Sequence, residues 1–547
     1  MGGVETVLVL VVLATVVAAS AHRLRVPAPS LLVLAGLVVG LVPGVPTVQV
    51  TPEAVGLVVL PPLLYAASEE LSWRDLRAVW RPVAVLAIGL VLASAAVVAV
   101  VATAVTPLPA SMAFVLGAVL ASTDPVAVTA LGRRLPLPAR VQALVQAESL
   151  FNDATSLVLF RVAVSIAVAG GTVAGAAFGG PASWAWAVGQ FVLLAGGGVL
   201  AGATVAAGVA AVRRRTEDPV LETVIALVTP YAAYVAAEVL HVSGVTAVIV
   251  AGVILATQAV RLSNADIRLQ LHAVYGTVVF LLEAVVFSLI GLELPALLRE
   301  SEISAGDWPV QAMLITGVLL AMRVLWVFPL SAMLARRGGG RPSWRVSAVV
   351  VWAGSRGVLP LAAALSIPLA DAAGGPLAGR DLVLLLTTAV IVFTLVVQGF
   401  TLAPLVRRSG VALAPEHARN EDTTARLRMA QAALGHVEEL AEAEAAPEVV
   451  LDGLRRGLQV RIGRARLNAD AGSADGGPAG GGPPVDGRAA GAQPDGGPTY
   501  RELRRDLIAV ESAELTRLYE TGEIGADTRK RLQRLLDLED AGLSGGI

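Results

Sequence analysis

The sequence of 547 residues contains no cysteine, a single lysine and few charged residues of either sign. The absence of cysteine excludes a disulfide framework and any cysteine-ligated metal site. Charged residues make up 15% of the chain and hydrophobic residues 55%, a balance that soluble proteins of this length do not have. The composition therefore indicates a membrane protein.

Sequence motifs of several other protein classes are also missing. No Walker-type glycine-rich loop occurs, and neither the H-E-x-x-H nor the G-x-S-x-G motif of hydrolases is present. The alternating ten-residue strands of a membrane β-barrel are not seen either, so the membrane-spanning elements are expected to be helices. We therefore expect a helical membrane protein that is not an enzyme, has no cofactor and binds no nucleic acid.

Apolar runs follow one another up to about residue 408. A bilayer core about 30 Å thick needs about 20 mostly apolar residues per helix, so these runs predict an all-α polytopic protein with thirteen transmembrane helices. The first run has a glutamate and no basic flank, which favours a first span over a cleaved signal peptide. The predicted spans are 3–21, 30–46, 54–70, 82–105, 111–131, 139–169, 186–212, 219–240, 243–260, 272–298, 310–335, 345–370 and 382–407.

Arginine is distributed unevenly over the predicted loops. Loops after odd-numbered spans carry nineteen arginines, whereas loops after even-numbered spans carry only Arg299 and Arg380. Because cytoplasmic loops retain basic residues, we expect the N-terminus outside the cell and the C-terminus in the cytoplasm. A miscounted span would have scrambled this alternation, so the asymmetry also supports the count of thirteen.

The end of the chain has a different composition. We expect a transmembrane domain over residues 1–408 and a cytoplasmic tail over residues 409–547, which carries 17 basic and 23 acidic residues. Residues 416–446 and 500–542 have the charge pattern of soluble helices. The Gly/Pro-rich stretch at about 469–499 is typical of a flexible linker. The tail is either a solvated appendage or a module for regulation or partner binding.

A polar stripe interrupts the apolar sixth span. The stretch "AESLFNDATS" places four polar side chains on one side of a helix with 3.6 residues per turn: Glu148, Ser149, Asn152 and Asp153. Ionisable groups at membrane depth are costly and usually mark ion paths. Side chains that only hold helices together are normally Ser, Thr, Asn or Gln. Two acids within six residues therefore favour an ion path over a purely structural role.

Two other spans contain helix breakers beside a charged residue. In the fifth span, "ASTDPVAV" puts Asp124 before Pro125, and a proline disfavours helix at the preceding residue and removes a backbone donor. Freed carbonyls and a carboxylate suit a small hard cation, although Asp124 could also simply cap the second half of a kinked helix. In the twelfth span, "WAGSRGVLP" surrounds Arg356 with two glycines and a proline.

The two broken spans are seven apart and therefore run in opposite directions. Such a pair is the mark of an inverted-repeat transporter, whose site lies where the broken helices cross. Arg356 cannot lose its charge and needs a partner, and we predict that this partner is Glu148. Other charged groups at membrane depth adjoin no helix break and are expected in structural ion pairs or interfaces: Arg161, Glu238, Glu283, Glu293 and Arg323.

The motifs "LPPLLYAASEELSWRDL", "ASTDPVAV", "AESLFNDATSLVLF", "FSLIGLEL" and "WAGSRGVLPLAAALSIP" occur in this order along the chain. Together they resemble the bacterial sodium/proton antiporters of the electroneutral, NhaP-like branch of the monovalent cation:proton antiporters, relatives of the animal sodium/proton exchangers. The resemblance covers residues 1–408. It implies a 13-helix inverted-repeat bundle that forms homodimers in the cell membrane and exchanges sodium ions for protons.

The resemblance also implies roles for individual residues. The implied sodium site consists of Asp153, Asp124, Thr123 and Ser149. Asp153 is the carboxylate that exchanges sodium for a proton, and Asn152 holds it in position. Glu148 and Arg356 match the structural ion pair of the family. Many members have an acidic residue where this chain has Ala66, so this site is expected to have one ligand fewer.

The carboxamide of Asn152 cannot carry a proton, whereas in the electrogenic relatives this position resembles a second aspartate. We therefore expect one proton per monovalent cation and no net current, in the service of sodium and pH homeostasis. Potassium in place of sodium is the main alternative, and lithium is a further candidate substrate. A channel and a sodium-coupled solute symporter are the alternatives outside this function. Flux without proton counterflow would indicate the channel, and uptake of an organic solute would indicate the symporter.

Overall fold

The computed structural model describes residues 12, 14–17, 19–20, 27–42, 55–124, 138–169, 181–216, 218–262, 264–300, 307–337, 343–371, 374–411, 415–474 and 498–544. Over these residues all regular elements are helices, and the β-type pairings are two isolated bridges. The predicted all-α class is confirmed. Most of the first predicted span, Pro125 and most of the predicted linker at 469–499 lie outside the described residues.

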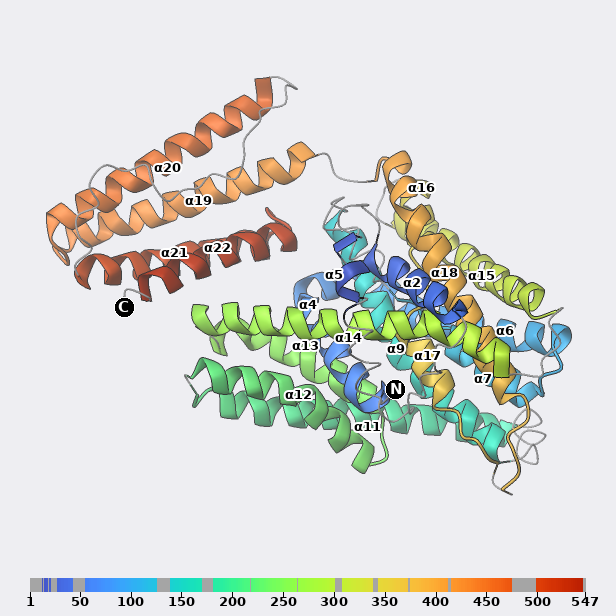
Figure 1. The fold of residues 1–547 in the computed structure, drawn as a ribbon. Helices are drawn as coiled ribbons and strands as arrows, with labels where there is room; N and C mark the ends of the chain where they lie inside the picture. Colours follow the sequence, from blue (N-terminus) through green and yellow to red (C-terminus); the bar gives the residue numbers. More distant parts are fainter. Residues whose placement is uncertain are drawn as a thin grey trace. The chain divides into compact units, whose positions relative to one another are not determined.

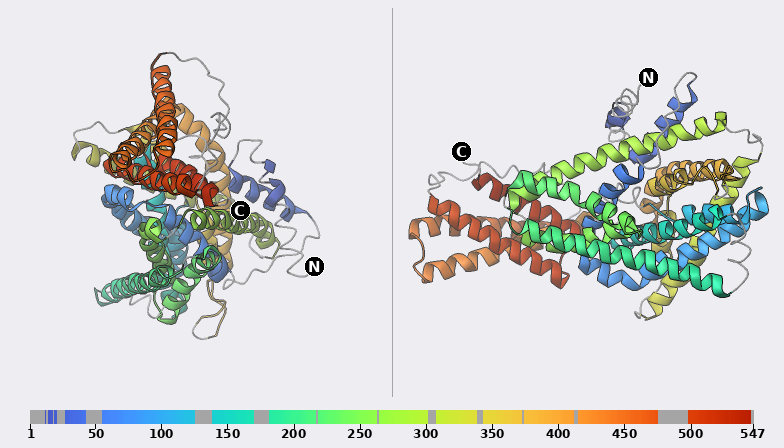
Figure 2. Two further views of the ribbon diagram at one scale, coloured as in Figure 1. Left: turned by 90° about the vertical axis from the view of Figure 1, so that its left-hand side faces the viewer. Right: turned by 90° about the horizontal axis from the view of Figure 1, so that it is seen from below.

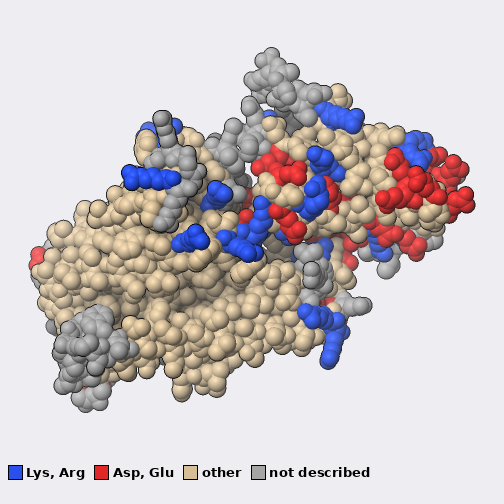
Figure 3. Space-filling model, turned by 180° about the vertical axis from the view of Figure 1, so that it is seen from behind, with Lys and Arg blue, Asp and Glu red and all other residues tan. Residues whose placement is uncertain are grey.

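The chain divides into two compact units. The first consists of Met1–Leu262 and Leu271–Ala412, and the second of Ser263–Gln270 and Leu413–Ile547. On the face shown in Figure 3, the surface of the first unit is mostly uncharged, whereas acidic and basic side chains gather on the second. This difference follows the change in composition along the sequence.

The helices of the first part of the chain coincide with the predicted spans except at one place. We expected Arg74, Arg77 and Arg81 to lie in a loop, but they lie on α5, which continues through η2 into α6 as one stretch of 33 residues. Apolar side chains three or four residues apart are buried on the other side of α5. The charged residues of this amphipathic helix lower its mean hydropathy, so it was not recognised as part of an apolar run. The elements are α2 (Ala28–Leu41), η1 (Val55–Val59), α4 (Leu60–Glu70), α5 (Trp73–Ala84), η2 (Val85–Leu90), α6 (Val91–Val105), α7 (Ala110–Leu120) and α9 (Ala139–Val168).

The remaining helices of the apolar part also follow the predicted spans. They are α11 (Pro181–Arg213), α12 (Pro219–Val239), α13 (Gly244–Leu262), α14 (Ala265–Glu300), α15 (Trp308–Arg337), α16 (Trp344–Trp352), α17 (Val358–Leu365) and α18 (Arg380–Ser409). Helices α11, α12 and α13 lie side by side (Figure 1). Among the described residues, seven helices are long and apolar enough to cross a membrane and three shorter ones are apolar. The chain is thus a multi-pass membrane protein, while the count of thirteen spans stays a prediction.

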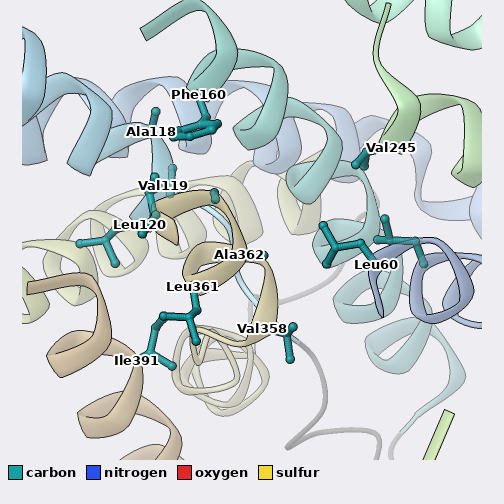
Figure 4. Packing of buried hydrophobic residues seen from close by; sticks show 14 of the residues in the cluster. Leu60, Ala118, Val119, Leu120, Phe160, Val245, Val358, Leu361, Ala362 and Ile391 are labelled. Atoms are coloured by element: carbon teal, nitrogen blue, oxygen red, sulfur yellow. The ribbon is translucent and has the colours of Figure 1, made fainter. Parts of the chain in front are cut away.

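Apolar side chains form a continuous core around the short helices α7 and α17. Figure 4 shows Leu361 of α17 beside Ile391 of α18, and Ala118 and Val119 of α7 beside Phe160 of α9. Gly117 of α7 lies so close to the backbone of α6 that a β-carbon there would overlap it. Small residues allow such close backbone contact between membrane helices. This packing fixes the ends of α7 and α17, where the candidate site lies.

The second unit is built mainly from four charged helices: α19 (Pro415–Glu442), α20 (Glu448–Ala474), α21 (Pro498–Thr521) and α22 (Ala526–Ser544). Helices α19 and α20 form an antiparallel pair (Figures 1 and 2). Helix α20 was not predicted, and residues 500–542 form two helices where one was expected. Gly522, with φ 88°, lies between these two helices, in a conformation that glycine adopts without steric cost.

Candidate functional site

The predicted break in the twelfth span is confirmed. Helix α16 ends at Trp352 and helix α17 begins at Val358, and residues 353–357 between them are not helical. The glycines and proline around Arg356 explain this local structure, because glycine weakens a helix and proline cannot donate a helical hydrogen bond. The unwound stretch leaves main-chain polar groups without helical partners.

The fifth span unwinds opposite this break. Helix α7 ends at Leu120, and residues 122–124 are not helical. The backbone N–H of Asp124 donates to the carbonyl of Ser355 at 2.7 Å, and the Ser355 hydroxyl donates to the carbonyl of Asp124 at 3.0 Å. The backbones of Asp124 and Ser355 form an isolated antiparallel β-bridge, to which the hydroxyl adds a side-chain bond. The two unwound stretches therefore lie against each other.

The polar stripe of α9 faces the unwound residue Thr123. The Thr123 backbone N–H donates to Asn152 Oδ1 at 3.0 Å, and Asn152 Nδ2 donates to Thr123 Oγ1 at 2.7 Å. The Ser149 hydroxyl donates to the Thr123 carbonyl. We predicted that Asn152 positions Asp153. Instead its carboxamide contacts Thr123, because the unwound backbone offers groups that need hydrogen-bond partners.

Asp153 lies on the same side of α9 and is 7% exposed. The Ser122 side chain is a hydrogen-bond partner of its carboxylate, and the charges of Asp124 and Arg356 interact electrostatically with it. The carboxylate of Asp124 lies against the backbone at Gly357, where any β-carbon would overlap it. Gly357 precedes α17 as its N-cap residue, so this carboxylate is at the positive end of a half-helix.

Glu148 pairs with Arg323, and the predicted pairing with Arg356 is wrong. The Arg323 Nη1 is 2.6 Å from Glu148 Oε1, and both side chains are buried. Arg323 also donates from Nε to the carbonyl of Val351 at 3.2 Å and from Nη2 to that of Val350 at 2.9 Å. These carbonyls end α16, so the guanidinium lies at the negative end of that half-helix. It therefore satisfies a helix end and Glu148 together.

Arg323 was expected to lie in a structural ion pair or an interface, without a place in the site. Arg323 comes from α15, and no break in its own helix marks it. Its contacts depend on how α15 packs against α16 and on the reach of its side chain to Glu148 of α9, which no local pattern encodes. The other predicted groups at membrane depth include Arg161 and Glu238, which form an ion pair of their own.

Arg356 lies inside the second break and is 2% exposed. Its backbone N–H donates to Thr394 Oγ1 at 3.2 Å, and its Nη1 donates to the carbonyl of Gly354 at 3.0 Å. Its Nε has no hydrogen-bond partner among the described residues. The charged groups that act on it are Arg323, Glu148 and Asp153. The guanidinium thus lies where the unwound stretches 122–124 and 353–357 meet, which we call the crossing. It forms no ion pair within the described part of the chain.

The crossing therefore brings together all of the predicted site residues. Carboxylates, hydroxyls and an unwound backbone converge in a buried place, which is the donor set that a dehydrated hard cation prefers. The carboxylates are also the groups in it that can take up a proton. The arrangement can hold a small cation or a proton at membrane depth.

Comparisons with known proteins identify relatives that are named for the exchange of sodium ions and protons. Residues 8–408 match the family described as "Sodium/hydrogen exchanger, transmembrane". A Mycobacterium tuberculosis (strain ATCC 25618 / H37Rv) protein named as an uncharacterized Na(+)/H(+) exchanger is 36% identical over 458 residues, which is 82% of each chain. The Na(+)/H(+) antiporter ApNhaP of Aphanothece halophytica is 31% identical over 389 residues, or 71% of this chain and 70% of the relative.

A further relative and a solved structure extend the comparison. The "Sodium, potassium, lithium and rubidium/H(+) antiporter" of Bacillus pumilus is 30% identical over 398 residues, covering 70% of this chain and 58% of that protein. The structure of the sodium proton antiporter MjNhaP1 from Methanocaldococcus jannaschii matches with a TM-score of 0.58 and 21% identity, over 75% of this chain and 97% of that one. At this identity the structural likeness concerns the fold.

Proposed function

The chain belongs to the sodium/hydrogen exchanger family, and from this premise we propose that it exchanges one sodium ion for one proton across the cell membrane without moving net charge. The observation that carries the proposal is the β-bridge between Asp124 and Ser355, which joins two helix breaks beside the buried carboxylate of Asp153. The family consists of transporters, so ion gradients supply the energy.

Asp153 is proposed to bind either the proton or the cation. An uncompensated charge at membrane depth is costly, so the site favours states in which the Asp153 carboxylate is neutralised. A proton and a sodium ion compete for the same carboxylate oxygens, and binding of one therefore releases the other. When the occupied site is exposed alternately to the two sides of the membrane, this competition becomes exchange.

Asp124, Thr123 and Ser149 are proposed to complete the cation site. Hydroxyl and carbonyl oxygens retain lone pairs beyond the hydrogen bonds described above, so the Ser149 hydroxyl and the Thr123 carbonyl can each still face a cation. Asn152 supports the site indirectly, since its carboxamide holds Thr123 in the unwound conformation. The position of Ala66 contributes no carboxylate to this set.

The identity of the cation is the part of the proposal with a specific rival. One relative carries potassium, lithium and rubidium in its name beside sodium, so potassium/proton exchange is the second candidate function. Proton flux in vesicles, followed with a pH-sensitive dye while sodium, lithium and potassium are added separately, tests the proposal. Flux with sodium supports it, flux with potassium alone supports the rival, and no cation-dependent proton flux contradicts both.

The proposal also includes the arrangement in the membrane. The uneven arginine distribution supports an extracellular N-terminus and a cytoplasmic C-terminus. A homodimer is proposed from the family resemblance.

A membrane potential is expected neither to drive nor to retard exchange. The reason is that Asn152 leaves Asp153 as the single exchanging group, so one proton balances one monovalent cation. The measurement is the sodium gradient that nulls proton flux at a fixed pH difference, with the potential clamped at several values by potassium and valinomycin, provided that potassium is not a substrate. A null point that moves with the potential would contradict electroneutral exchange.

The replacement Gly357→Ala is expected to reduce the exchange rate by about tenfold or more, because the new methyl group overlaps the Asp124 carboxylate and small displacements of reacting groups have large rate effects. Gly317→Ala in α15 is the matched control, since a β-carbon at Gly317 meets nothing within 4 Å. Both variants are compared by sodium-dependent dye response in proteoliposomes at equal protein density. Equal rates would show that the position of Asp124 does not matter for transport.

A further inference from the structure

Helix α14 belongs to both compact units of the chain. Its first residues, up to Gln270, group with the charged helices α19 to α22, and its residues from Leu271 onward group with the apolar part. The helix is continuous over Ala265–Glu300, and it is long and apolar enough to cross a membrane. One uninterrupted helix therefore passes from the second unit into the membrane part.

The first turns of α14 form an ion pair with α22. Arg268 Nε donates to Asp537 Oδ2 at 3.1 Å and Arg268 Nη2 donates to Asp537 Oδ1, and such two-point pairing fixes orientation as well as distance. The side chain of Asp537 is 8% exposed and that of Arg268 is 27% exposed, and Ala265 and Ile267 beside it are buried. The carboxylate of this pair is therefore largely shielded from water, which makes the pair stronger than an exposed one.

Asp537 lies on a helix that is itself fixed in place. Gln533 Nε2 donates to Asp537 Oδ1 at 3.1 Å, and Gln533 Oε1 accepts the hydroxyl of Ser512 on α21 at 3.0 Å. Near the start of α22, Glu421 of α19 accepts the backbone N–H of Gly525 at 3.1 Å. Apolar side chains of α19, α21 and α22 pack into one core cluster. These helices thus present a fixed acceptor to Arg268.

Further along, α14 contacts two helices of the apolar part. The Tyr275 hydroxyl donates to the carbonyl of Ala226 on α12 at 3.3 Å. Gly291 lies so close to the backbone of α2 at Val33 that a β-carbon there would overlap it. Rigid secondary elements carry coupling between distant sites, so a restraint on the first turns of α14 reaches these contacts in the membrane part.

We infer that the helices α19 to α22 are a built-in restraint on exchange, which acts by holding the first turns of α14 through the Arg268–Asp537 pair. The inference rests on the proposed exchange function, because alternate exposure of the site requires helices of the membrane part to move. A helix that is held at one end moves less readily. The intact pair therefore slows exchange, and its release accelerates exchange.

The test removes both charges at once, because a single replacement would leave a buried charge without a partner. Arg268→Gln/Asp537→Asn in the full chain is reconstituted in proteoliposomes, and sodium-dependent proton flux is measured at saturating sodium and equal protein density. We expect the maximal rate to rise about threefold or more, within the range by which residues of a coupled element change coupling. A pair that only stabilises the fold would leave the rate unchanged or lower it, and either result overturns the inference.

The matched control is Asp452→Asn/Arg455→Gln. These two residues form an ion pair three residues apart within α20 of the same unit, so the control also removes one charge of each sign but leaves the first turns of α14 untouched. Its maximal rate is expected to match the wild type. An equal acceleration in this control would show that the effect does not depend on α14, and it would overturn the inference.

A cross-link decides the question if the double variant loosens the fold of the second unit. The chain has no cysteine, so Arg268→Cys/Asp537→Cys introduces two unique thiols, which a reducible bifunctional thiol reagent joins. Exchange is expected to be fast before joining, slow once mass spectrometry shows the intramolecular link, and fast again after reduction. Joined protein that is as fast as unjoined protein overturns the inference. Absence of sodium-dependent flux in the wild type would instead contradict the proposed function.

Discussion

Replacing Asp153 by asparagine is expected to abolish sodium-driven proton flux while the protein remains folded. Asparagine has nearly the shape of aspartate, but it neither takes up a proton nor offers a negative charge to a cation. Asp153 is buried on α9 at the crossing, next to Asp124, and the other carboxylate of that helix, Glu148, is paired with Arg323. Proteoliposomes with a trapped pH-sensitive dye would report the loss, and detergent melting curves would report the fold.

The matched control for this variant is Asp218→Asn. Asp218 is the N-cap residue of α12, where its Oδ1 accepts the backbone N–H of Val220 at 2.8 Å. Asparagine is as good an N-cap residue as aspartate, and Asp218 lies outside the crossing, so wild-type flux is expected. A normal dye response from Asp153→Asn at equal protein density would show that exchange does not depend on this carboxylate.

The second large effect concerns stability. Arg323→Met is expected to destabilise the protein by about 3–5 kcal/mol, because it leaves the buried carboxylate of Glu148 without its partner. The Arg323 hydrogen bonds to the Val350 and Val351 carbonyls at the end of α16 would be lost as well. The melting temperature in detergent measures the loss. Gly354→Ala is expected to act in the same direction, since a β-carbon at Gly354 overlaps the Arg323 guanidinium.

A double-mutant cycle identifies the pair. Glu148→Gln/Arg323→Met should be less harmful than the sum of the two single replacements, because groups in direct contact couple energetically. The half-exposed pair Arg161–Glu238 provides the comparison, since pairs with access to solvent contribute at most about 1 kcal/mol. Additive losses for Glu148 and Arg323 would mean that the two side chains are not partners.

The sequence by itself determined those features that depend on neighbouring residues. Apolar runs of sufficient length predicted the membrane helices from α2 to α18, because transfer into a bilayer is a property of about 20 consecutive side chains. Glycine and proline around Arg356 predicted the break between α16 and α17, because both residues act on the local backbone. The 3.6-residue period placed Ser149, Asn152 and Asp153 on one side of α9.

Features that depend on contacts between distant segments were decided only by the tertiary structure. Glu148 and Arg323 are 175 residues apart in sequence, and the choice of Arg323 over Arg356 follows from the packing of α15 beside α16, which brings the Arg323 side chain to Glu148. The carboxamide of Asn152 forms its hydrogen bonds with Thr123 for a similar reason. Thr123 belongs to another segment, whose unwound backbone has polar groups that need hydrogen-bond partners. Local composition gives a side chain its charge and its place along a helix. Its partner is chosen by which helices pack together and which polar groups they leave unsatisfied.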